Sequence, residues 1–597
     1  MAWYDEAVFY HIYPLGLTGA PKENSYGAPE HRLNTLLPWI DHIKNIGCNA
    51  IYIGPLFESV GHGYETTDYK KLDSRLGDND DLKNFVAECH KKGIKVIFDG
   101  VFNHTGRDFF AFKDIKEKRE SSPYRDWYCN VNFYGNNEYN DGFSYDNWGG
   151  YNLLVKLNQR NPAVRDYICD VIRFWVSEFD VDGIRLDAAD VLDFDFMKAL
   201  RQVANEVKPD FWLMGEVIHG DYSRWVNEGT LHSVTNYQLH KALYSGHNDH
   251  NFFEIAHTVK RLYEMGGGNS NKFKLYNFVD NHDVERIYTK LTNKAHFAPV
   301  HILLYTLPGI PSIYYGSEFG IEGRKEKFSD ASLRPALNLA DYQDAVETNS
   351  FTALIAALGN IRQQSKALSY GDFKELTLTN RQYAFSRSFE GECVIVTVNN
   401  DDSDFVMTVP AGNAAGYVGA LSGEKVSVTN GTICVNVKAN SGDIWLPVTD
   451  GNSFKADGKP VTLDVNDAVK NIAEDAAAEQ PSAEPSAIEK TPADHKTEEA
   501  SAKKDATANT AIEEAAAQTV GETPSAAGHA SNTAPAQSEP CISPEYAEAF
   551  EKGKIAGLQE AILAIMEKNG PVTDQMRKDV TDNVYHDSLI NWVKSFR

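Results

Sequence analysis

Short apolar runs and longer amphipathic stretches follow one another over about the first 350 residues of the chain. Short runs rich in β-branched and aromatic residues are typical of buried strands, whereas apolar residues three and four positions apart are typical of a helix face. The runs predict eight strands, at residues 8–13, 50–55, 95–99, 183–187, 212–216, 233–237, 277–280 and 311–315.

Helices are predicted between these strands. The clearest covers residues 162–179, where Pro162 stands at the first helical position and the apolar residues share one face. Eight strands that alternate with helices predict a closed (β/α)8 TIM barrel, formed by residues 1–104 and 153–360. The irregular segment 105–152, rich in Tyr, Asn and Gly, follows the third strand and is predicted to be an inserted loop domain.

Residues 361–448 change to an alternation of apolar and polar positions, for example at 393–398 and 432–437. Gly, Asn and Asp separate these short strands, which predicts a C-terminal antiparallel β-sandwich. Trp445 belongs to this domain, and we expect it to pack in the core rather than to bind a ligand at the surface.

Residues 449–541 are predicted to be a disordered acidic linker. Between residues 471 and 540 there are 20 alanines, thirteen acidic residues, four basic residues and no aromatic residue. Such a composition cannot bury enough apolar surface to offset the entropy of ordering. In the tail, residues 542–597, apolar residues return at helical spacing and predict two or three short helices. The tail is interpreted either as a module that binds a protein partner or self-associates, or as a self-contained bundle.

The charge balance excludes one large class of partners. The chain has 84 acidic and 58 basic residues and a formal net charge of −26, whereas proteins that bind nucleic acid need a basic surface. No apolar run approaches the ~20 residues of a membrane span, so no membrane partner is predicted. The start of the sequence lacks the basic and apolar segments of a secretory signal, which favours a cytoplasmic location. The alternative is an extracellular protein whose leader lies outside this sequence.

Three carboxylates stand where predicted strands end, and the C-terminal ends of the strands form the active site of a TIM barrel. They are Asp187, Glu216 and Asp283. Arg185 shares a strand face with Asp187, and its positive charge favours an ionised Asp187, as a nucleophile requires. Glu216 ends an apolar run, and apolar surroundings raise the pKa of a carboxyl group, as a general acid requires. Two carboxyl groups with different pKa values are suited to cleaving a glycosidic bond.

Four segments, in the same order, resemble the signatures of the α-amylase family of glycoside hydrolases. They are residues 99–104 (DGVFNH), 183–187 (GIRLD), 215–217 (GEV) and 278–283 (FVDNHD). Further similarity to the family lies in residues 47–57, 62–64 and 309–318. The resemblance covers roughly residues 1 to 447, and it implies a TIM barrel that acts on an α-glucan oligosaccharide or polysaccharide.

The resemblance also implies a role for each matching residue. Asp187 is expected to be the nucleophile, Glu216 the acid/base, and Asp283 the residue that stabilises the transition state. Four further residues are expected to bind the sugar at the cleavage site, Tyr64 by stacking on its ring and Arg185, His104 and His282 by hydrogen bonds.

The chain departs from the family pattern at the calcium site. The resemblance implies calcium bound by the Asn of the first signature, here Asn103, and by a His four residues after the nucleophile, but that position is Val191. We therefore expect no required cofactor, no metal among the site residues and no structural Ca²⁺ at the usual place. Oxygen-rich side chains of the insert, Asp141, Asp146 and Asn147, are the alternative place for an ion.

The predicted function is that of a retaining α-glucan hydrolase that cleaves α-1,4 glucosidic bonds in starch or maltodextrins. Residues 153–158 resemble a diverged form of a segment that marks neopullulanases and cyclomaltodextrinases. Those activities, and 4-α-glucanotransferase activity, are therefore alternatives. An alternative of another class is a catalytically silent glucan-binding protein, although all three acids are present.

Overall fold

The computed structural model describes residues 2–268, 273–327, 329–448 and 460–468 of the 597-residue chain. The predicted helical tail, and the predicted linker apart from residues 460–468, lie outside the described residues. Among the helices of the described part, none is both long enough and apolar enough to cross a bilayer.

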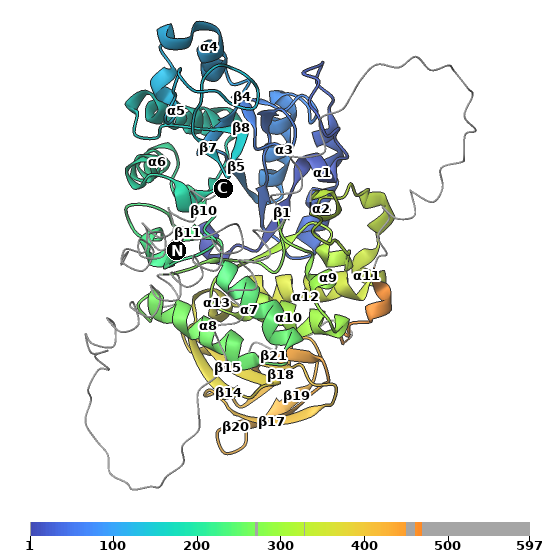
Figure 1. Cartoon of the computed structure of the whole chain (residues 1–597). Helices are drawn as coiled ribbons and strands as arrows, with labels where there is room; N and C mark the ends of the chain where they lie inside the picture. Colours follow the sequence, from blue (N-terminus) through green and yellow to red (C-terminus); the bar gives the residue numbers. More distant parts are fainter. Residues whose placement is uncertain (1, 269–272, 328, 449–459, 469–597) are drawn as a thin grey trace, which may run out of the picture. The chain divides into compact units, whose positions relative to one another are not determined.

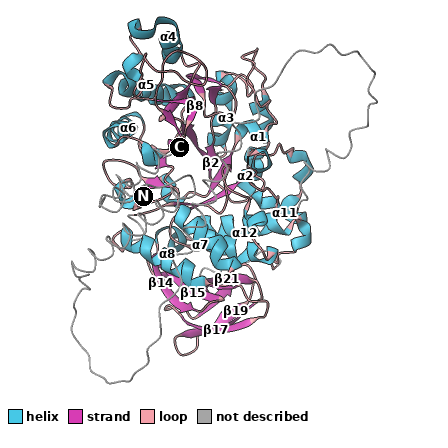
Figure 2. Ribbon diagram, in the orientation of Figure 1, coloured by secondary structure: helices cyan, strands magenta, loops and turns pink. Residues whose placement is uncertain are grey.

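Eight parallel strands form the barrel (Figures 1 and 2). They are β1 Phe9–Ile12, β2 Ala50–Ile53, β5 Lys95–Gly100, β9 Gly183–Leu186, β10 Trp212–Gly215, β11 Ser233–Val234, β12 Tyr276–Asn277 and β13 Ile310–Tyr314. The strand order is β11-β10-β9-β5-β2-β1-β13-β12, so neighbours in the chain are neighbours in the sheet. A parallel bridge between Thr235 and Tyr276 joins the two edge strands and closes the sheet. The predicted TIM barrel is thereby confirmed.

Helices cover the outside of this sheet (Figure 2). The helix α5 spans Pro162–Phe179, the predicted range, because Asn161 caps its first turn and Asp180 ends it in a left-handed conformation with φ of 55°. The other helices outside the insert are α1 Pro14–Leu17, α2 Trp39–Asn45, α3 Asn79–Lys91, α6 Phe194–Val207, α7 Tyr237–Asn248, α8 Phe252–Met265, α9 Ile287–Lys290, α10 Phe297–Thr306, α11 Ala345–Thr348, α12 Ser350–Gln364 and α13 Lys366–Tyr370.

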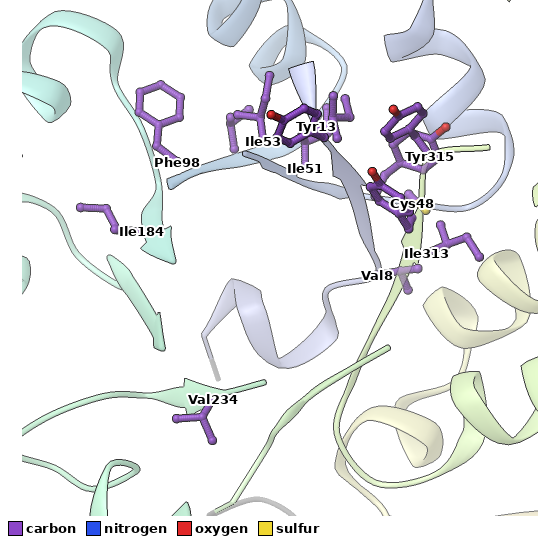
Figure 3. Packing of buried hydrophobic residues seen from close by; sticks show 14 of the residues in the cluster. Val8, Tyr13, Cys48, Ile51, Ile53, Phe98, Ile184, Val234, Ile313 and Tyr315 are labelled. Carbon is purple, nitrogen blue, oxygen red and sulfur yellow. The ribbon is translucent and has the colours of Figure 1, made fainter. Parts of the chain in front are cut away.

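Side chains of the strands alternate between the two sides of the barrel wall. Phe9 and Trp212 belong to an apolar cluster inside the barrel. Ile184 and Leu186 belong to a second cluster, between the strands and the helices, as the sequence predicts. Figure 3 shows Ile184 and Phe98 of this second cluster on neighbouring strands. Because successive residues face opposite sides, the polar residues next to them point into the barrel.

The predicted insert forms a small sheet of its own. The antiparallel strands β6 His104–Gly106, β8 Tyr151–Lys156 and β7 Asn147–Trp148 lie in that order, and the helix α4 Phe110–Lys118 comes between β6 and β7 in the chain. A further hairpin, β3 Phe57–Ser59 and β4 Thr66–Leu72, follows the second barrel strand.

Two antiparallel sheets form the C-terminal domain, which confirms the predicted fold class. One contains β14 Asp372–Leu378, β15 Gln382–Phe389, β16 Glu392–Asn399, β21 Ser441–Val448, β18 Gly416–Gly419 and β19 Lys425–Ser427, and the other pairs β17 Phe405–Pro410 with β20 Thr432–Val437. Helices α7, α10 and α12 separate these sheets from the barrel strands (Figure 1). Trp445 is buried in the core of the domain and donates a hydrogen bond to Oγ1 of Thr397 at 3.0 Å. Its expected packing role is confirmed.

Residues 460–468 pack against the barrel, although they lie in the range predicted to be a linker. The main-chain N–H of Ser350 donates to a carboxylate oxygen of Asp467 at 3.1 Å, and Nδ2 of Asn349 donates to the Asp467 carbonyl oxygen at 2.8 Å. Val461 and Leu463 pack on the apolar core. These residues precede the alanine-rich stretch 471–540, on whose composition the linker prediction rests, and their own apolar side chains are partly buried.

Candidate active site

Three neighbouring strands bring their carboxylates to one end of the barrel. Asp99 lies near the end of β5, Asp187 directly follows β9, and Glu216 directly follows β10. The chain continues the parallel ladder at this point, because the Glu216 N–H donates to the Leu186 carbonyl oxygen at 2.9 Å. The C-terminal ends of adjacent parallel strands lie side by side, and the three carboxylates therefore meet.

Arg185 lies at the centre of these acids. It is opposite Asp99 in the β5–β9 register, so both side chains point into the barrel. Its Nη1 lies 2.8 Å from Oδ1 of Asp99 and 2.9 Å from Oδ1 of Asp187, and its Nη2 lies 2.8 Å from Oε2 of Glu216. The Arg185 side chain is 3% exposed, whereas those of Asp187 and Glu216 are 11% and 14% exposed. The guanidinium therefore orients both acids and leaves them accessible.

The local charges act in opposite directions on Asp187. Burial raises the pKa of its carboxyl group well above the usual range, Arg185 opposes this shift, and the negative charges of Glu216, Asp99 and Asp283 add to it. The lowering that the sequence predicts from Arg185 is therefore present, but burial and the neighbouring acids outweigh it. Crowded carboxyl groups share protons as a unit, so the cluster can retain a proton at a pH at which isolated acids are ionised.

Asp283 lies in the loop after β12, next to an imidazole and a guanidinium. Its Oδ2 lies 3.0 Å from Nε2 of His282, and its Oδ1 lies 2.8 Å from Nη2 of Arg334. Burial opposes ionisation, but His282, Arg334 and Arg185 together hold the pKa of Asp283 well below its usual range. Arg334 also donates from Nε to the His282 carbonyl oxygen at 3.0 Å, which orients this loop.

Tyr64 links the two groups of acids. Its hydroxyl lies 2.5 Å from Nε2 of His282 and donates to Oδ2 of Asp99 at 3.1 Å. The rings of Tyr64 and His282 are stacked, with centroids 5.7 Å apart and planes 13° apart. Tyr52 donates a second hydrogen bond to Asp99, at 2.9 Å. The structure thus brings together Tyr64, His282 and the acids predicted from the sequence.

His104 is a buried, neutral imidazole at the start of the insert. Burial lowers its pKa to about 3, and its Nε2 has no hydrogen-bond partner among the described residues. Its Nδ1 lies 3.3 Å from Nδ2 of Asn103. The ring of Trp148, in β7, has its centroid 6.1 Å from the His104 ring. A neutral imidazole with an unused nitrogen is suited to a hydrogen bond with a hydroxyl group.

The side chains near Asn103 do not form a calcium site. Oδ1 of Asn103 accepts from Nε2 of Gln159 at 3.3 Å, and Oε1 of Gln159 accepts from the N–H of Asp193 at 2.7 Å. The side chain of Val191 offers no ligand atom and is 46% exposed. The side chain of Gln159 therefore bridges two segments by hydrogen bonds, and Asn103 and Val191 do not provide the six to eight oxygens that calcium needs.

Asp141, Asp146 and Asn147, the predicted alternative place for an ion, have protein partners. Both carboxylate oxygens of Asp141 contact Arg107, at 2.9 and 2.8 Å, and Asp146 accepts from Nδ2 of Asn130 at 2.8 Å. Nδ2 of Asn147 donates to Oδ1 of Asn152 at 2.8 Å. These contacts shape the insert and do not collect oxygens around one point.

One cluster elsewhere in the described residues has ligand atoms close enough for a metal, namely His31, Asp78 and Asp81. Its carboxylates cap helix α3: Asp78 accepts from the N–H groups of Asp80 and Asp81, and Asp81 accepts from the N–H of Asp78. Capping accounts for this arrangement without an ion.

Sequence reasoning missed four residues of this region. Arg334 and Gln159 lie in loops, where no strand or helix period marks them. Tyr52 lies inside a strand that reads as apolar, and Trp148 lies in the irregular insert. The one signal in the sequence is the i, i+4 spacing of Arg334 and Asp330, which form an ion pair at 3.0 Å.

Known proteins resemble this chain in sequence and in fold. The family description "Alpha amylase, catalytic domain" matches residues 32–367. A cyclomaltodextrinase of Thermoanaerobacter pseudethanolicus is 31% identical over 68% of this chain and 72% of its own length. Neopullulanase 2 of Thermoactinomyces vulgaris is 29% identical over 74% of this chain and 78% of its own length. A solved cyclomaltodextrinase structure superposes with a TM-score of 0.65 at 26% identity, over 74% of this chain and 78% of that one.

Proposed function

Because the chain belongs to the α-amylase family of glycoside hydrolases, we propose that it cleaves α-1,4 glucosidic bonds of maltodextrins or starch with retention of configuration. One observation carries this proposal: a single buried guanidinium, that of Arg185, contacts both Asp187 and Glu216. Retaining glycosidases need one carboxylate as nucleophile and one carboxylic acid as proton donor on either side of the scissile bond.

In the first step, protonated Glu216 donates its proton to the glycosidic oxygen while the bond from C1 to that oxygen breaks. The Asp187 carboxylate bonds to C1 and forms a β-glycosyl intermediate. Asp283, which its cationic neighbours hold ionised, stabilises the positive charge that develops on the sugar ring. Arg185 acts as a positioning residue, because both of its Nη atoms contact carboxylates.

In the second step, the Glu216 carboxylate takes a proton from water, and the resulting hydroxide oxygen bonds to C1 as the bond to Asp187 breaks. Two inversions leave the α configuration. Tyr64 packs against the ring of the sugar, while His104 and His282 hydrogen-bond its hydroxyl groups. The unused Nε2 of His104 and the unused Nδ1 of His282 support these roles.

A second candidate is preferential action on cyclomaltodextrins or pullulan, with or without glucan transfer. The relatives named cyclomaltodextrinase and neopullulanase favour it. Chromatography of the products from maltoheptaose, pullulan and β-cyclodextrin, compared side by side, separates the candidates. Products longer than the substrate indicate glucan transfer. A cleavage rate that is highest on β-cyclodextrin indicates a cyclomaltodextrinase.

The test of the catalytic assignment is Asp187→Asn, which we expect to lower maltoheptaose turnover by at least about 10⁴-fold, since it removes the nucleophile. Asp170→Asn, on the outer face of α5, is the matched control and should keep full activity. Retention of most activity by Asp187→Asn contradicts the assignment. Wild-type protein without measurable turnover on any of the three substrates supports the silent glucan-binding alternative instead.

A further inference from the structure

His11 is a buried imidazole next to the candidate active site, and the proposed mechanism gives it no role. It lies in β1 and is 3% exposed. Phe9, two residues earlier in the same strand, belongs to the apolar cluster inside the barrel. Alternate residues of a strand face the same side, so His11 also points into the barrel. Its Nε2 has no hydrogen-bond partner in the described part of the chain, so this nitrogen does not hold the ring in place.

Aromatic rings hold His11 instead. In the strand registers it is opposite Tyr52 of β2 and opposite Tyr314 of β13. Its ring is stacked on that of Tyr52, with centroids 4.2 Å apart and planes 25° apart, and the centroid of Tyr314 lies 4.9 Å away. A third ring, that of His282, meets it at 88° with centroids 5.2 Å apart. The two neighbouring strands therefore fix His11, and His11 in turn makes an edge-to-face contact with His282.

This contact differs from the other ring contacts of His282. The planes of Tyr13 and Tyr64 lie within 14° and 13° of the His282 plane, whereas the His11 plane is nearly perpendicular to it. Because protein interiors are closely packed, the perpendicular ring occupies space into which His282 could otherwise turn. The orientation of His282 decides where its Nε2 lies, and this atom contacts Oδ2 of Asp283 at 3.0 Å.

The His11 ring acts through its shape rather than through a charge. Burial lowers the pKa of His11 well below its ordinary value. The positive charges of His282, Arg185 and Arg286 lower it further, and the negative charge of Asp283 opposes them. His11 is therefore neutral near pH 7, and it adds no positive charge beside the guanidinium that holds the carboxylates.

We propose that His11 is a positioning residue of the active site, whose ring fixes the orientation of His282 and thereby the place of Asp283. This inference rests on the proposed function, in which Asp283 stabilises the transition state. The same ring supports Tyr52, whose hydroxyl donates to Oδ2 of Asp99 at 2.9 Å. One residue of β1 thus contacts a partner of each group of acids.

Kinetics of three variants test the proposal. His11→Ala should lower kcat on maltoheptaose by at least about tenfold and change KM by less than about threefold, because the contribution of Asp283 is made in the transition state. His11→Phe restores a ring without nitrogens and should return kcat to within about threefold of the wild type. Phe9→Val, which removes volume from the same face of β1, is the matched control and should leave kcat within about twofold. Equal losses of kcat in His11→Ala and Phe9→Val, or a His11→Phe variant as slow as His11→Ala, overturn the proposal.

A crystal structure of the His11→Ala variant gives a measurement that does not depend on turnover. We expect the His282 ring to turn into the vacated space and its contact with Asp283 to be lost. A His282 ring that keeps its orientation overturns the proposal. If His11→Ala does not fold, His11→Asn, which keeps a smaller planar group, replaces it in both experiments with the same expected outcomes. Wild-type protein without turnover on maltoheptaose, pullulan or β-cyclodextrin contradicts the proposed function, whereas a displaced His282 ring in the variant still supports the positioning role of His11.

Discussion

Nη2 of Arg185 lies 2.8 Å from Oε2 of Glu216, and the two residues come from adjacent strands of the barrel. The same guanidinium holds Asp187 through Nη1. The distance between the proposed nucleophile and the proposed acid/base is therefore set by one rigid, planar group rather than by two independent loops. Lysine cannot reproduce this geometry, because its ammonium is a single point charge on a flexible chain.

Arg185→Lys should lower both activity and stability. We expect kcat/KM on maltoheptaose to fall by about 100-fold or more, since small misplacements of reacting groups have effects of that size. Breaking a buried ion pair should lower the free energy of unfolding by about 3 kcal/mol. Urea denaturation and initial rates measure the two effects. Arg173→Lys, in an exposed ion pair on α5, is the control, and equal effects of both substitutions contradict the prediction.

Asp187→Asn should stabilise the fold near pH 7. Burial and the neighbouring acids raise the pKa of Asp187, so its ionised form opposes folding at any pH above that raised pKa. A neutral amide removes the charge, and we expect the free energy of unfolding to rise by about 1 kcal/mol. The gain should begin to shrink as the pH falls below the raised pKa and should disappear only near the ordinary pKa of the unfolded chain, where both states of the wild type are protonated. Urea denaturation at several pH values measures this, and a loss of stability at pH 7 contradicts it.

The outcome for Asp283→Asn should have the opposite sign. The cationic neighbours of Asp283 depress its pKa, so its ionised form stabilises the fold above the pKa of the unfolded chain. The variant should be less stable than the wild type at pH 7. The difference should shrink as the pH falls through the depressed pKa of the folded state. Because this carboxylate is partly exposed, solvent reduces the effect, and the sign is the quantity to test.

A double-mutant cycle identifies the cation responsible. In the presence of Arg334→Ala, the substitution Asp283→Asn should lose most of its effect on stability, since Arg334 contacts the carboxylate directly. Arg324→Ala, in the same loop and 80% exposed, is the matched control and should leave that effect unchanged. If Arg334→Ala and Arg324→Ala change the effect of Asp283→Asn on stability equally, a group other than Arg334 depresses the pKa of Asp283.

The barrel was predictable because its signal is local. Alternating side chains and short apolar runs placed all eight strands, and Ile184 and Leu186 face the helices as expected. The predicted ends were less accurate where tertiary contacts take over. The strand predicted at 277–280 ends at Asn277, because the Asp280 carboxylate turns to accept hydrogen bonds from the Ile287 N–H and the Ser317 hydroxyl.

The candidate site was predictable only where a strand or a signature carries it. Asp187 and Glu216 end strands, and the register of β9 follows from the alternation. Arg334 contacts Asp283 from a loop 51 positions further along the chain, and no periodic pattern in the sequence predicts such a contact. The hydrogen bonds of Gln159 could not be predicted for the same reason. Val191 in place of the family's His indicated only that the calcium site differs here.

Removing divalent cations should leave the fold intact. Gln159 joins Asn103 to the start of α6 by hydrogen bonds, so this junction needs no ion. We expect EDTA to shift the melting temperature by less than about 1 °C, whereas Gln159→Ala should lower the free energy of unfolding by about 1–3 kcal/mol. Gln202→Ala, on the exposed surface of α6, is the control. A fall of several degrees in EDTA that calcium reverses contradicts the prediction.

Trp148→Ala should weaken substrate binding without slowing the chemistry. The Trp148 ring is 39% exposed and lies 6.1 Å from the His104 ring, so it offers an apolar face beside the proposed sugar site. Burying such a face against a sugar is worth about 1–2 kcal/mol, which predicts a rise in KM for maltoheptaose of roughly tenfold. A platform of this kind binds substrate and transition state equally, so kcat should stay within about twofold.

Trp148→Phe should keep most of the affinity. Tyr134→Ala removes a fully exposed aromatic ring from the same insert and should change neither constant. An equal rise in KM for both alanine variants, or a fall in kcat alone, assigns Trp148 to the structure of the insert instead.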